Sequence, residues 1–255
     1  MKESPLLARL NDVRMGFLTL TRLPMGVISG VVPSMAASAW SWPLVGAVVG
    51  AISGLIYCAA LWLGIAPMLA AALAIATLVL VTGGLHEDGL ADLADGFGGG
   101  RDRARVLEIM RDSRIGSYGA IAIGFSLLIR VVALGGLGAC AGFWALIGLG
   151  AASRAGLPAV LRMVPSARDD GLGHAASGVS AQASILALTL GFLALLPLGL
   201  SVAFGVAVAV ACVTAGLGLW AKARIGGQTG DVLGAMCQLG EIAGWLVVSA
   251  HLQAA

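Results

Sequence analysis

Long runs without charged side chains dominate the hydropathy pattern of this chain. No Asp, Glu, Lys, Arg or His occurs between Ser41 and Leu85. Three further runs, two of them interrupted by one charged residue each, cover 115–153, 175–221 and 232–250. Because one membrane-crossing helix needs roughly 20 apolar residues, the runs 41–85, 115–153 and 175–221 are each long enough for two crossings. The pattern therefore predicts helices that cross a membrane in pairs.

Glycine and proline mark the ends of the expected crossings. We expect these at Pro43–Leu63, Pro67–Gly83, Ser117–Leu137, Ala139–Pro158, Ala183–Leu198 and Val202–Trp220. The turns within each pair are short and uncharged, and they contain Gly64, Gly138 or Gly199. The last apolar stretch, Val232–His251, is either a seventh crossing or a re-entrant segment. We therefore predict an all-α bundle of six to seven transmembrane helices.

Ionic side chains are concentrated in the segments between the pairs. These segments are Met1–Trp42, Gly84–Gly116, Ala159–Gln182 and Ala221–Asp231. Because loops rich in Lys and Arg remain on the cytoplasmic side of a membrane, all four are predicted to be cytoplasmic. We expect a multi-pass protein of the cell inner membrane whose active-site loops face the cytoplasm.

The N-terminal segment, 1–42, is predicted to lie at the membrane interface. Between Pro5 and Leu23, apolar side chains recur at helical spacing among charged ones: Leu6, Leu10, Val13, Phe17 and Leu20. This pattern favours an amphipathic helix lying in the interface. A short helix packed on the rest of the protein outside the membrane is the alternative.

Composition supports a single integral-membrane domain over residues 1–255. Hydrophobic residues make up 59% of the chain and charged residues 11%, and the mean hydropathy is +0.97. The formal net charge of +2 indicates little about partners and gives no sign of nucleic-acid binding. The four cysteines show no C-x-x-C spacing, and no secretory signal is visible at the N-terminus.

The stretch H-E-D-G-L-A-D-L-A-D-G-F-G-G-G, His86–Gly100, carries the strongest chemical signal. If it is helical, Asp88, Asp92 and Asp95 share one face at i, i+4 and i+7. Their mutual repulsion, roughly 2–3 kcal/mol per pair at an effective dielectric near 20, requires a proton or a cation. A Mg²⁺ ion is the simplest answer; a solvated acidic face is the alternative. Glu87 points about 100° off that face and is a weaker metal candidate.

Two other features of this stretch suggest a ligand. Its glycines, Gly89, Gly96 and Gly98–Gly100, disfavour a helix, so we interpret them as room for close approach of a diphosphate. His86 is either a base or substrate contact or simply the residue at which the helix begins.

Two further charged segments suit an anionic substrate. Arg111 and Arg114 lie next to the acidic stretch, where guanidinium groups could clamp phosphate oxygens; the alternative is an ordinary surface helix. Thr229 and Asp231 lie in K-A-R-I-G-G-Q-T-G-D-V-L-G-A, Lys222–Ala235, a glycine-rich loop ahead of a helix. Such a loop can present backbone N–H groups to an anion, although an ordinary interhelical turn has the same composition.

Three charged residues lie at apparent bilayer depth. Arg130 and Glu241 should face protein, water or each other, because an exposed charge there costs roughly 2.5–3.5 kcal/mol. Arg154 lies toward the cytoplasmic end of its crossing and could reach the same site as the other arginines. Metal, diphosphate and arginine together indicate transfer on a phosphoanhydride.

Physical reasoning leaves several classes of membrane protein open. They are CDP-alcohol phosphotransferases, diphosphate-dependent prenyltransferases, and enzymes that assemble nucleotide-activated lipids or cofactors. A transporter is less favoured, because the acids lie outside the crossings rather than at the midplane.

Four ordered motifs, however, closely resemble the cobalamin synthase family, also called adenosylcobinamide-GDP ribazoletransferase. They are the acidic stretch, I-M-R-D-S-R-I-G-S-Y-G after it, the early F-L-T-L-T-R-L-P and the late G-G-Q-T-G-D-V-L-G-A. The resemblance spans nearly the whole chain and departs from the usual pattern only by an extra Leu-Thr within Phe17–Leu23.

The resemblance implies an integral-membrane, Mg²⁺-dependent enzyme of a late step in cobalamin synthesis. It would join adenosylcobinamide-GDP and α-ribazole, or α-ribazole phosphate, and release GMP. By position, Asp88, Asp92 and Asp95 would bind metal, with Asp231 a further carboxylate. Arg111, Arg114 and Arg154 would hold phosphate, and His86 and Asp95 are both open as general base. Membrane lipid, other cobalamin-assembly enzymes or a second copy of the chain are the expected macromolecular partners.

Overall fold

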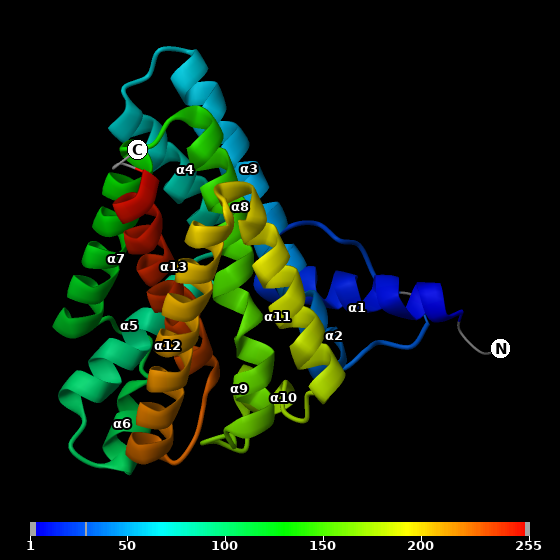
Figure 1. The fold of residues 1–255 in the computed structure, drawn as a ribbon. Coiled ribbons are helices and arrows are strands. Elements are labelled where there is room, and N and C mark those ends of the chain that lie inside the picture. The colour runs from blue at the N-terminus through cyan, green and yellow to red at the C-terminus, as the bar shows by residue number, and fades with distance from the viewer. Residues whose placement is uncertain (1–3, 29, 253–255) are drawn as a thin grey trace.

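The helices follow the apolar runs closely. The computed structural model describes residues 4–28 and 30–252, and these contain helices and no strand (Figure 1). The main bundle consists of α3 (Trp42–Trp62), α4 (Pro67–Thr82), α7 (Ser117–Gly135), α8 (Ala139–Ala155), α11 (Ala181–Leu195), α12 (Leu200–Ile225) and α13 (Gly230–Leu252). Shorter elements are α1 (Pro5–Leu20), α2 (Met35–Ser38), α5 (Leu85–Gly99), α6 (Arg103–Ile109), α9 (Leu157–Met163), α10 (Gly171–Ala175) and the 3₁₀ turns η1 (Ala39–Ser41) and η2 (Leu196–Leu198).

The predicted all-α membrane bundle is confirmed. Among the described residues, six helical segments are long and apolar enough to cross a membrane, and α4 with α5 makes a seventh if that bent pair counts as one. The expected starts and ends agree to within a few residues, except that the fourth crossing continues through α9 to Met163 and α12 extends to Ile225. At 23 residues, α13 is about 35 Å long, enough for a full crossing.

The two ends of the bundle differ in chemistry. The uncharged turns α3–α4, α7–α8 and α11–α12 lie toward one end, together with the end of α13 (Figure 1). The charged segments around α6, around α10 and between α12 and α13 lie at the other end (Figure 1). The predicted paired arrangement is therefore present. That the charged end faces the cytoplasm remains a prediction from its basic residues.

Close helix packing brings α8 into the centre of the bundle. A Cβ atom on Gly46 of α3 would lie 1.9 Å from the carbonyl oxygen of Gly150, and one on Gly50 would lie 2.2 Å from that of Leu146. These glycines therefore let the backbones of α3 and α8 touch, as small residues do between membrane helices. The most apolar stretch of α8 and α9 is 78% buried, against 28% for α7 and α11 at the rim.

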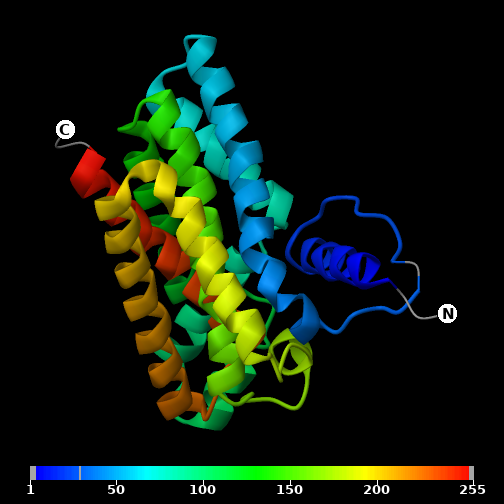
Figure 2. The same ribbon diagram turned by 45° about the vertical axis from the view of Figure 1, so that its right-hand side comes forward.

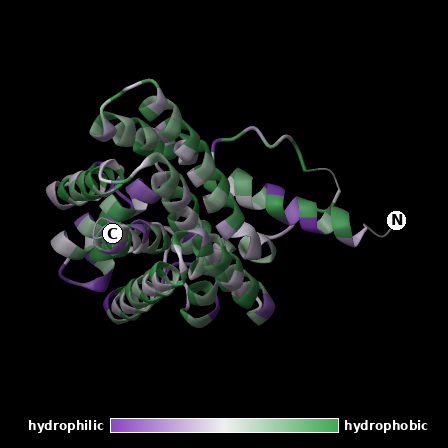
Figure 3. Ribbon diagram, turned by 45° about the horizontal axis from the view of Figure 1, so that its top comes forward, coloured by the Kyte–Doolittle hydropathy of each residue, from purple (hydrophilic) through white to green (hydrophobic). Residues whose placement is uncertain are grey.

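Helix α1 projects sideways from the bundle (Figures 1 and 2) and carries both polar and apolar residues (Figure 3). Its expected apolar face is divided. Phe17 and Leu20 are buried against the bundle, whereas Leu6 and Leu10 are 72% and 51% exposed. Asp12 is buried and accepts a hydrogen bond of 3.0 Å from the indole N–H of Trp40. The location of α1 in the membrane interface stays a prediction.

Candidate active site

The site begins at the crossing of α5 with α13. Gly83 and Gly84 both have positive φ, which glycine adopts without strain, and they let the chain turn by 88° between α4 and α5. We take α4 as the membrane-crossing arm of this pair and α5 as lying outside the spans, because α5 carries four carboxylates. A Cβ atom on Gly89 would lie 2.9 Å from the carbonyl oxygen of Asp231, so this glycine lets α5 touch the start of α13.

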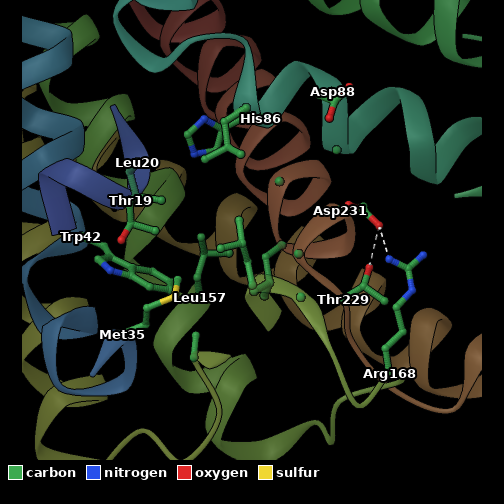
Figure 4. A pocket seen from close by; sticks show the side chains of 18 of the residues that line it. Thr19, Leu20, Met35, Trp42, His86, Asp88, Leu157, Arg168, Thr229 and Asp231 are labelled. Atoms are coloured by element: carbon green, nitrogen blue, oxygen red, sulfur yellow. Dashed lines mark hydrogen bonds and ion pairs between the residues drawn. The ribbon is translucent and has the colours of Figure 1, made fainter. Parts of the chain in front are cut away.

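A pocket of about 160 Å³ opens beside this crossing (Figure 4). Residues of α5, the start of α13, the segment before and within α10, and the junctions of α1, α2, α3 and α9 line it. Among the predicted site residues, His86, Asp88, Thr229 and Asp231 line this pocket. Two motifs that lie about 140 residues apart in the chain therefore meet in one cavity.

Two loops hold the polar wall of the pocket in place. The Gln228 N–H donates to the carbonyl oxygen of Pro165, and the Ala167 N–H donates to that of Gln228, both at 2.8 Å. The Gln228 side chain also donates to the carbonyl oxygen of Gly173 at 3.0 Å. These hydrogen bonds join the glycine-rich loop to the 165–173 segment and hold that segment at the pocket.

Arg168 is the basic residue among those that line the pocket. Its Nη1 lies 3.3 Å from Oδ2 of Asp231, and the Thr229 hydroxyl donates to the same carboxylate oxygen at 3.3 Å (Figure 4). Its Nη2 donates to the carbonyl oxygen of Leu107 at 3.3 Å. The Arg168 side chain is 14% exposed, so its charge is only partly screened by water.

Asp88 and Asp92 form an acidic face on α5 next to Asp231. Burial, and then the charges of Asp88, Asp231 and Asp95, raises the pKa of Asp92 to about 7. The predicted repulsion along this face is therefore present, and it would be relieved by a proton or a cation. As the side chains stand, no three His, Cys, Asp or Glu residues in the described part of the chain converge to hold a metal. Metal binding by Asp88, Asp92 and Asp95 stays a prediction.

Asp95 has a structural role that the sequence did not indicate. It is buried, and its two carboxylate oxygens accept hydrogen bonds from the N–H groups of Gly116, at 2.7 Å, and Gly119, at 2.9 Å. These groups belong to the first turn of α7, whose positive dipole end attracts a carboxylate. Asp95 therefore caps α7.

At Gly96, Gly98 and Gly100 the interpretation of the glycines as room for a diphosphate is wrong, whereas Gly89 lines the pocket and the interpretation stays a prediction there. A Cβ atom on Gly96 would lie 2.4 Å from the Met110 side chain, and one on Gly98 would lie 2.8 Å from the ring of Tyr118. The glycines of the following motif pack in the same way, because Cβ atoms on Gly116 and Gly119 would lie 2.3 and 2.4 Å from Asp95. Protein atoms occupy the space beside these glycines. Because the glycines have no side chain, α5, α6 and α7 can pack closely.

Glu87 belongs to a buried polar network behind the pocket. Its Oε1 accepts hydrogen bonds from Arg130, at 3.0 Å, and from the Gln238 side chain, at 2.9 Å. Arg130 also lies 3.7 Å from Glu241, which confirms the prediction that these two membrane-depth charges face each other. Arg130 is fully buried and Glu87 is 6% exposed. A metal role for Glu87 stays a prediction, although Arg130 already balances its charge.

The three arginines expected at phosphate lie outside the pocket lining. Arg111 pairs with Asp170 at 2.8 Å, and Arg114 pairs with Asp112 at 2.7 Å and holds the pKa of that carboxyl at about 2. Arg154 is 1% exposed and donates to the carbonyl oxygen of Gly150 within α8. A phosphate-binding role for these three stays a prediction.

His86 lies between the polar and apolar sides of the pocket (Figure 4). It is 3% exposed, and neither ring nitrogen has a hydrogen-bond partner. Burial, followed by the charges of Arg154 and Arg130, lowers the pKa of His86 well below its ordinary value. The imidazole is therefore neutral at pH 7 and has one nitrogen free to accept a proton.

Sequence reasoning missed most residues of the pocket, among them Arg168 and Trp42. Arg168 had been counted only among the basic residues of a loop, and Trp42 only as the end of the N-terminal segment. Neither lies in a motif, and no local spacing relates them to Asp88 or Asp231. Gly89 and Gly227 were the signal in the sequence that could have indicated close contacts here. A Cβ atom on Gly227 would lie 2.2 Å from the carbonyl oxygen of Pro165, so this glycine allows the segment that carries Arg168 to pack against the glycine-rich loop.

Comparison with known proteins finds relatives over nearly the whole chain. A family model described as cobalamin-5-phosphate synthase matches residues 12–249. Similar proteins named adenosylcobinamide-GDP ribazoletransferase include that of Mesorhizobium japonicum, 43% identical over 95% of this chain and 94% of that protein. The Bradyrhizobium diazoefficiens protein is 44% identical over 94% of this chain and 93% of that protein. The Azorhizobium caulinodans protein is 48% identical over 83% of this chain and 83% of that protein. No solved structure matches the chain.

Proposed function

The chain belongs to the cobalamin-5-phosphate synthase family, and on that premise we propose that the pocket between α5 and α13 joins adenosylcobinamide-GDP to α-ribazole or its phosphate. The products are adenosylcobalamin, or its phosphate, and GMP. The observation that carries this proposal is the meeting of Asp88, His86, Thr229, Asp231 and Arg168 in one cavity.

The reaction transfers a phosphoryl-linked group from one oxygen to another. A hydroxyl oxygen of the ribazole bonds to the phosphorus that carries cobinamide, and the bond from that phosphorus to the oxygen of GMP breaks. GMP leaves with the bonding electron pair, and the hydroxyl loses its proton. We propose His86 as the acceptor for that proton, because it lines the pocket and both its ring nitrogens are unpartnered. Its lowered pKa makes it a weak base, so its position rather than its basicity supports this role. Asp95, the other candidate, already accepts two backbone hydrogen bonds.

Arg168 is the residue we assign to the substrate phosphates. Its guanidinium lies on the polar wall and is shared with Asp231, so it is already oriented toward the pocket. Guanidinium groups bind phosphate oxygens with two parallel hydrogen bonds and stabilise charge that develops on them.

Magnesium binding by the acidic face is a further part of the proposal. The oxygens of Asp88, Asp92 and Asp231 are the hard ligands that Mg²⁺ prefers. The pKa of Asp92 is raised first by burial and then by the charges of the neighbouring carboxylates, which a cation would offset. Because Mg²⁺ usually takes only one or two protein carboxylates and completes its shell with water and substrate phosphates, a ready-made cluster of three is not required. The ion would neutralise the diphosphate and the departing GMP.

The location of the reaction follows from the charged end of the bundle. The pocket lies beside the segments that carry the loop arginines. Since basic residues are concentrated at this end, we propose that it faces the cytoplasm and that the protein resides in the cell inner membrane.

GMP release tests the function directly. Purified protein in lipid nanodiscs, supplied with adenosylcobinamide-GDP, Mg²⁺ and α-ribazole, should release GMP in proportion to the cobalamin formed. Asp88→Asn and Arg168→Met should each lower kcat/KM by roughly 100-fold or more, as removal of one charge-stabilising group does in other enzymes. Glu108→Gln and Arg162→Met, which change exposed residues outside the pocket, are the matched controls.

The same assay separates the other classes. Pyrophosphate released from a polyprenyl diphosphate would indicate a prenyltransferase, and CMP released from a CDP-alcohol would indicate that class of phosphotransferase. Full GMP turnover by Asp88→Asn would remove the acidic face from the mechanism.

A further inference from the structure

The two walls of the pocket differ in chemistry. Asp88, Thr229, Asp231 and Arg168 lie on one side, and Thr19, Leu20, Met35 and Trp42 lie on the opposite side, with Leu157 beside Met35 and Trp42 (Figure 4). The mechanism above uses only the polar wall and His86. The apolar wall therefore has no assigned role.

The apolar wall is built to accept a flat, apolar group. Trp42 contributes its indole and is 3% exposed, while Leu20 and Leu157 are 6% and 2% exposed. Met35 adds a flexible thioether, which adapts to the edge of a ring. Leu172 stands at the mouth of the same pocket and is 45% exposed.

We propose that this apolar wall binds the aromatic base of the attacking nucleoside, the dimethylbenzimidazole of α-ribazole. The inference rests on the proposed function, because it names where one of the two substrates lies. The base would pack among Trp42, Met35 and Leu157. Its ribose would then extend past His86 toward the polar wall, where the phosphates of the second substrate are held.

The volume of the pocket favours the base over the corrinoid as the group that binds there. A cavity of about 150 Å³ in another protein holds one benzene molecule, so about 160 Å³ fits a small aromatic group. The corrin macrocycle is several times larger and must remain outside the pocket. Its phosphate arm alone would reach the polar wall.

The polarity of the wall favours the dimethylbenzimidazole base over guanine as the group that binds there. Guanine has two N–H donor groups and a carbonyl acceptor on its edge, and burying them without partners would cost roughly 1–3 kcal/mol each. Apart from the Trp42 indole N–H, which has no hydrogen-bond partner, the apolar wall presents aliphatic and aromatic carbon. The hydroxyl of Thr19 already donates to the carbonyl oxygen of Met15 at 2.8 Å. Dimethylbenzimidazole has no N–H donor once it is joined to ribose, and its two methyl groups gain from burial.

A filling substitution at the mouth tests the inference. Leu172→Trp enlarges a side chain that is already half exposed, so the fold tolerates it. The KM for α-ribazole should rise by about tenfold or more, the scale set by loss of one stacked base, whereas kcat and the KM for adenosylcobinamide-GDP should stay within about twofold. Leu193→Trp, at an exposed leucine of α11 outside the pocket, is the matched control and should change neither KM.

Free dimethylbenzimidazole gives a readout that does not depend on turnover. It should bind wild-type protein in equilibrium dialysis, bind Leu172→Trp more weakly, and inhibit competitively against α-ribazole but not against adenosylcobinamide-GDP. If wild-type protein binds the base but releases no GMP, the proposed function fails and the base subsite stands. If GMP is released while Leu172→Trp raises the KM for adenosylcobinamide-GDP alone, raises both KM values alike, or raises neither, the base subsite is wrong and the function stands.

Discussion

Asp92 and Asp95 stand on the same helix, three residues apart, and have different surroundings. Asp95 is buried and its two oxygens are used by backbone N–H groups of α7. Asp92 lacks such donors and faces the other carboxylates, which together with burial raises its pKa to about 7. Two residues of one repeated D-x-x-D pattern therefore differ in role because their neighbours in space differ.

The capping role of Asp95 predicts a loss of stability. Asp95→Ala leaves the N–H groups of Gly116 and Gly119 without an acceptor, which should cost about 1–2 kcal/mol, the usual range for a lost cap. Asp95→Asn keeps one acceptor oxygen and should lose less. Thermal unfolding in detergent measures both, with Asp169→Ala in an exposed loop as the control. An unchanged melting temperature in Asp95→Ala would show that the cap contributes nothing.

The raised pKa of Asp92 predicts how stability changes with pH. The carboxyl binds its proton more tightly in the folded protein than in the unfolded chain, where its pKa is the ordinary 3.8, so its contribution to stability falls as pH rises from about 4 to 7. Without divalent cations, the protein should melt at a higher temperature at pH 6 than at pH 8. Asp92→Asn should reduce that difference.

Magnesium should reverse part of this trend if Asp92 binds it. The ionised carboxylate is the form that holds a cation, so added Mg²⁺ should raise the melting temperature more at pH 8 than at pH 6. Equal shifts at both pH values in wild-type protein and in Asp92→Asn would argue against Asp92 as a ligand.

At the scale of elements, one close contact between α5 and α13 determines the site. Gly89 and Gly234 lie on facing helices, and a Cβ atom on Gly234 would lie 3.3 Å from the Cα of Gly89. The distance between these helices sets how far Asp88 lies from Asp231. The pocket therefore requires glycine at this crossing, because glycine allows close helix approach, as small residues do at membrane-helix interfaces.

A single methyl group at this crossing should damage both fold and activity. Gly89→Ala places a Cβ 2.9 Å from the carbonyl oxygen of Asp231, which is backbone and cannot turn away. We expect a destabilisation of about 1–3 kcal/mol, as in other overpacked sites, together with reduced GMP release.

Gly124→Ala is the matched control for that change. It lies in α7 with no neighbouring atom within 4 Å, so alanine should be neutral there or slightly stabilising. If both variants behave alike, helix spacing is not what Gly89 controls.

At the scale of the whole molecule, buried charges join segments that are distant in the chain. Glu87 on α5, Arg130 on α7 and Glu241 on α13 share one network, with Gln238 and Ser126 hydrogen bonded at 2.8 Å. Trp245 also donates to Glu241, at 3.4 Å. Because Glu87 lies between His86 and Asp88 in sequence, this network holds the pocket-lining turn of α5 against the bundle.

Removing the cation of this network should be severe. Arg130→Leu leaves two buried carboxylates without a counter-charge, and breaking a buried ion pair from one side costs roughly 3–5 kcal/mol. Folded yield and melting temperature should fall sharply. Adding Glu87→Gln and Glu241→Gln to that variant should recover much of the loss, since no buried charge is then unpaired. Wild-type stability and turnover in Arg130→Leu alone would contradict this account.

Much of the architecture could be predicted because it depends on local composition. Apolar runs such as Ser41–Leu85 have few options other than helices in a membrane, since every backbone polar group there must be paired within its own segment. The pairing of crossings followed from short uncharged turns, and the family followed from four ordered motifs. The facing of Arg130 and Glu241 was also predictable, because neither charge can face lipid.

The composition of the pocket could not be predicted, because it depends on contacts between distant segments. The same acidic pattern contains Asp88, which lines the pocket, and Asp95, which caps α7, and spacing alone does not distinguish them. Arg168 and Trp42 reach the pocket from segments that carry no motif. The glycines next to the carboxylates indicated close approach correctly, but only tertiary packing decided that protein atoms approach Gly96 and Gly98 whereas Gly89 also lines the pocket. Composition thus determined which helices form and where they end, whereas helix crossings decided which side chains share a cavity.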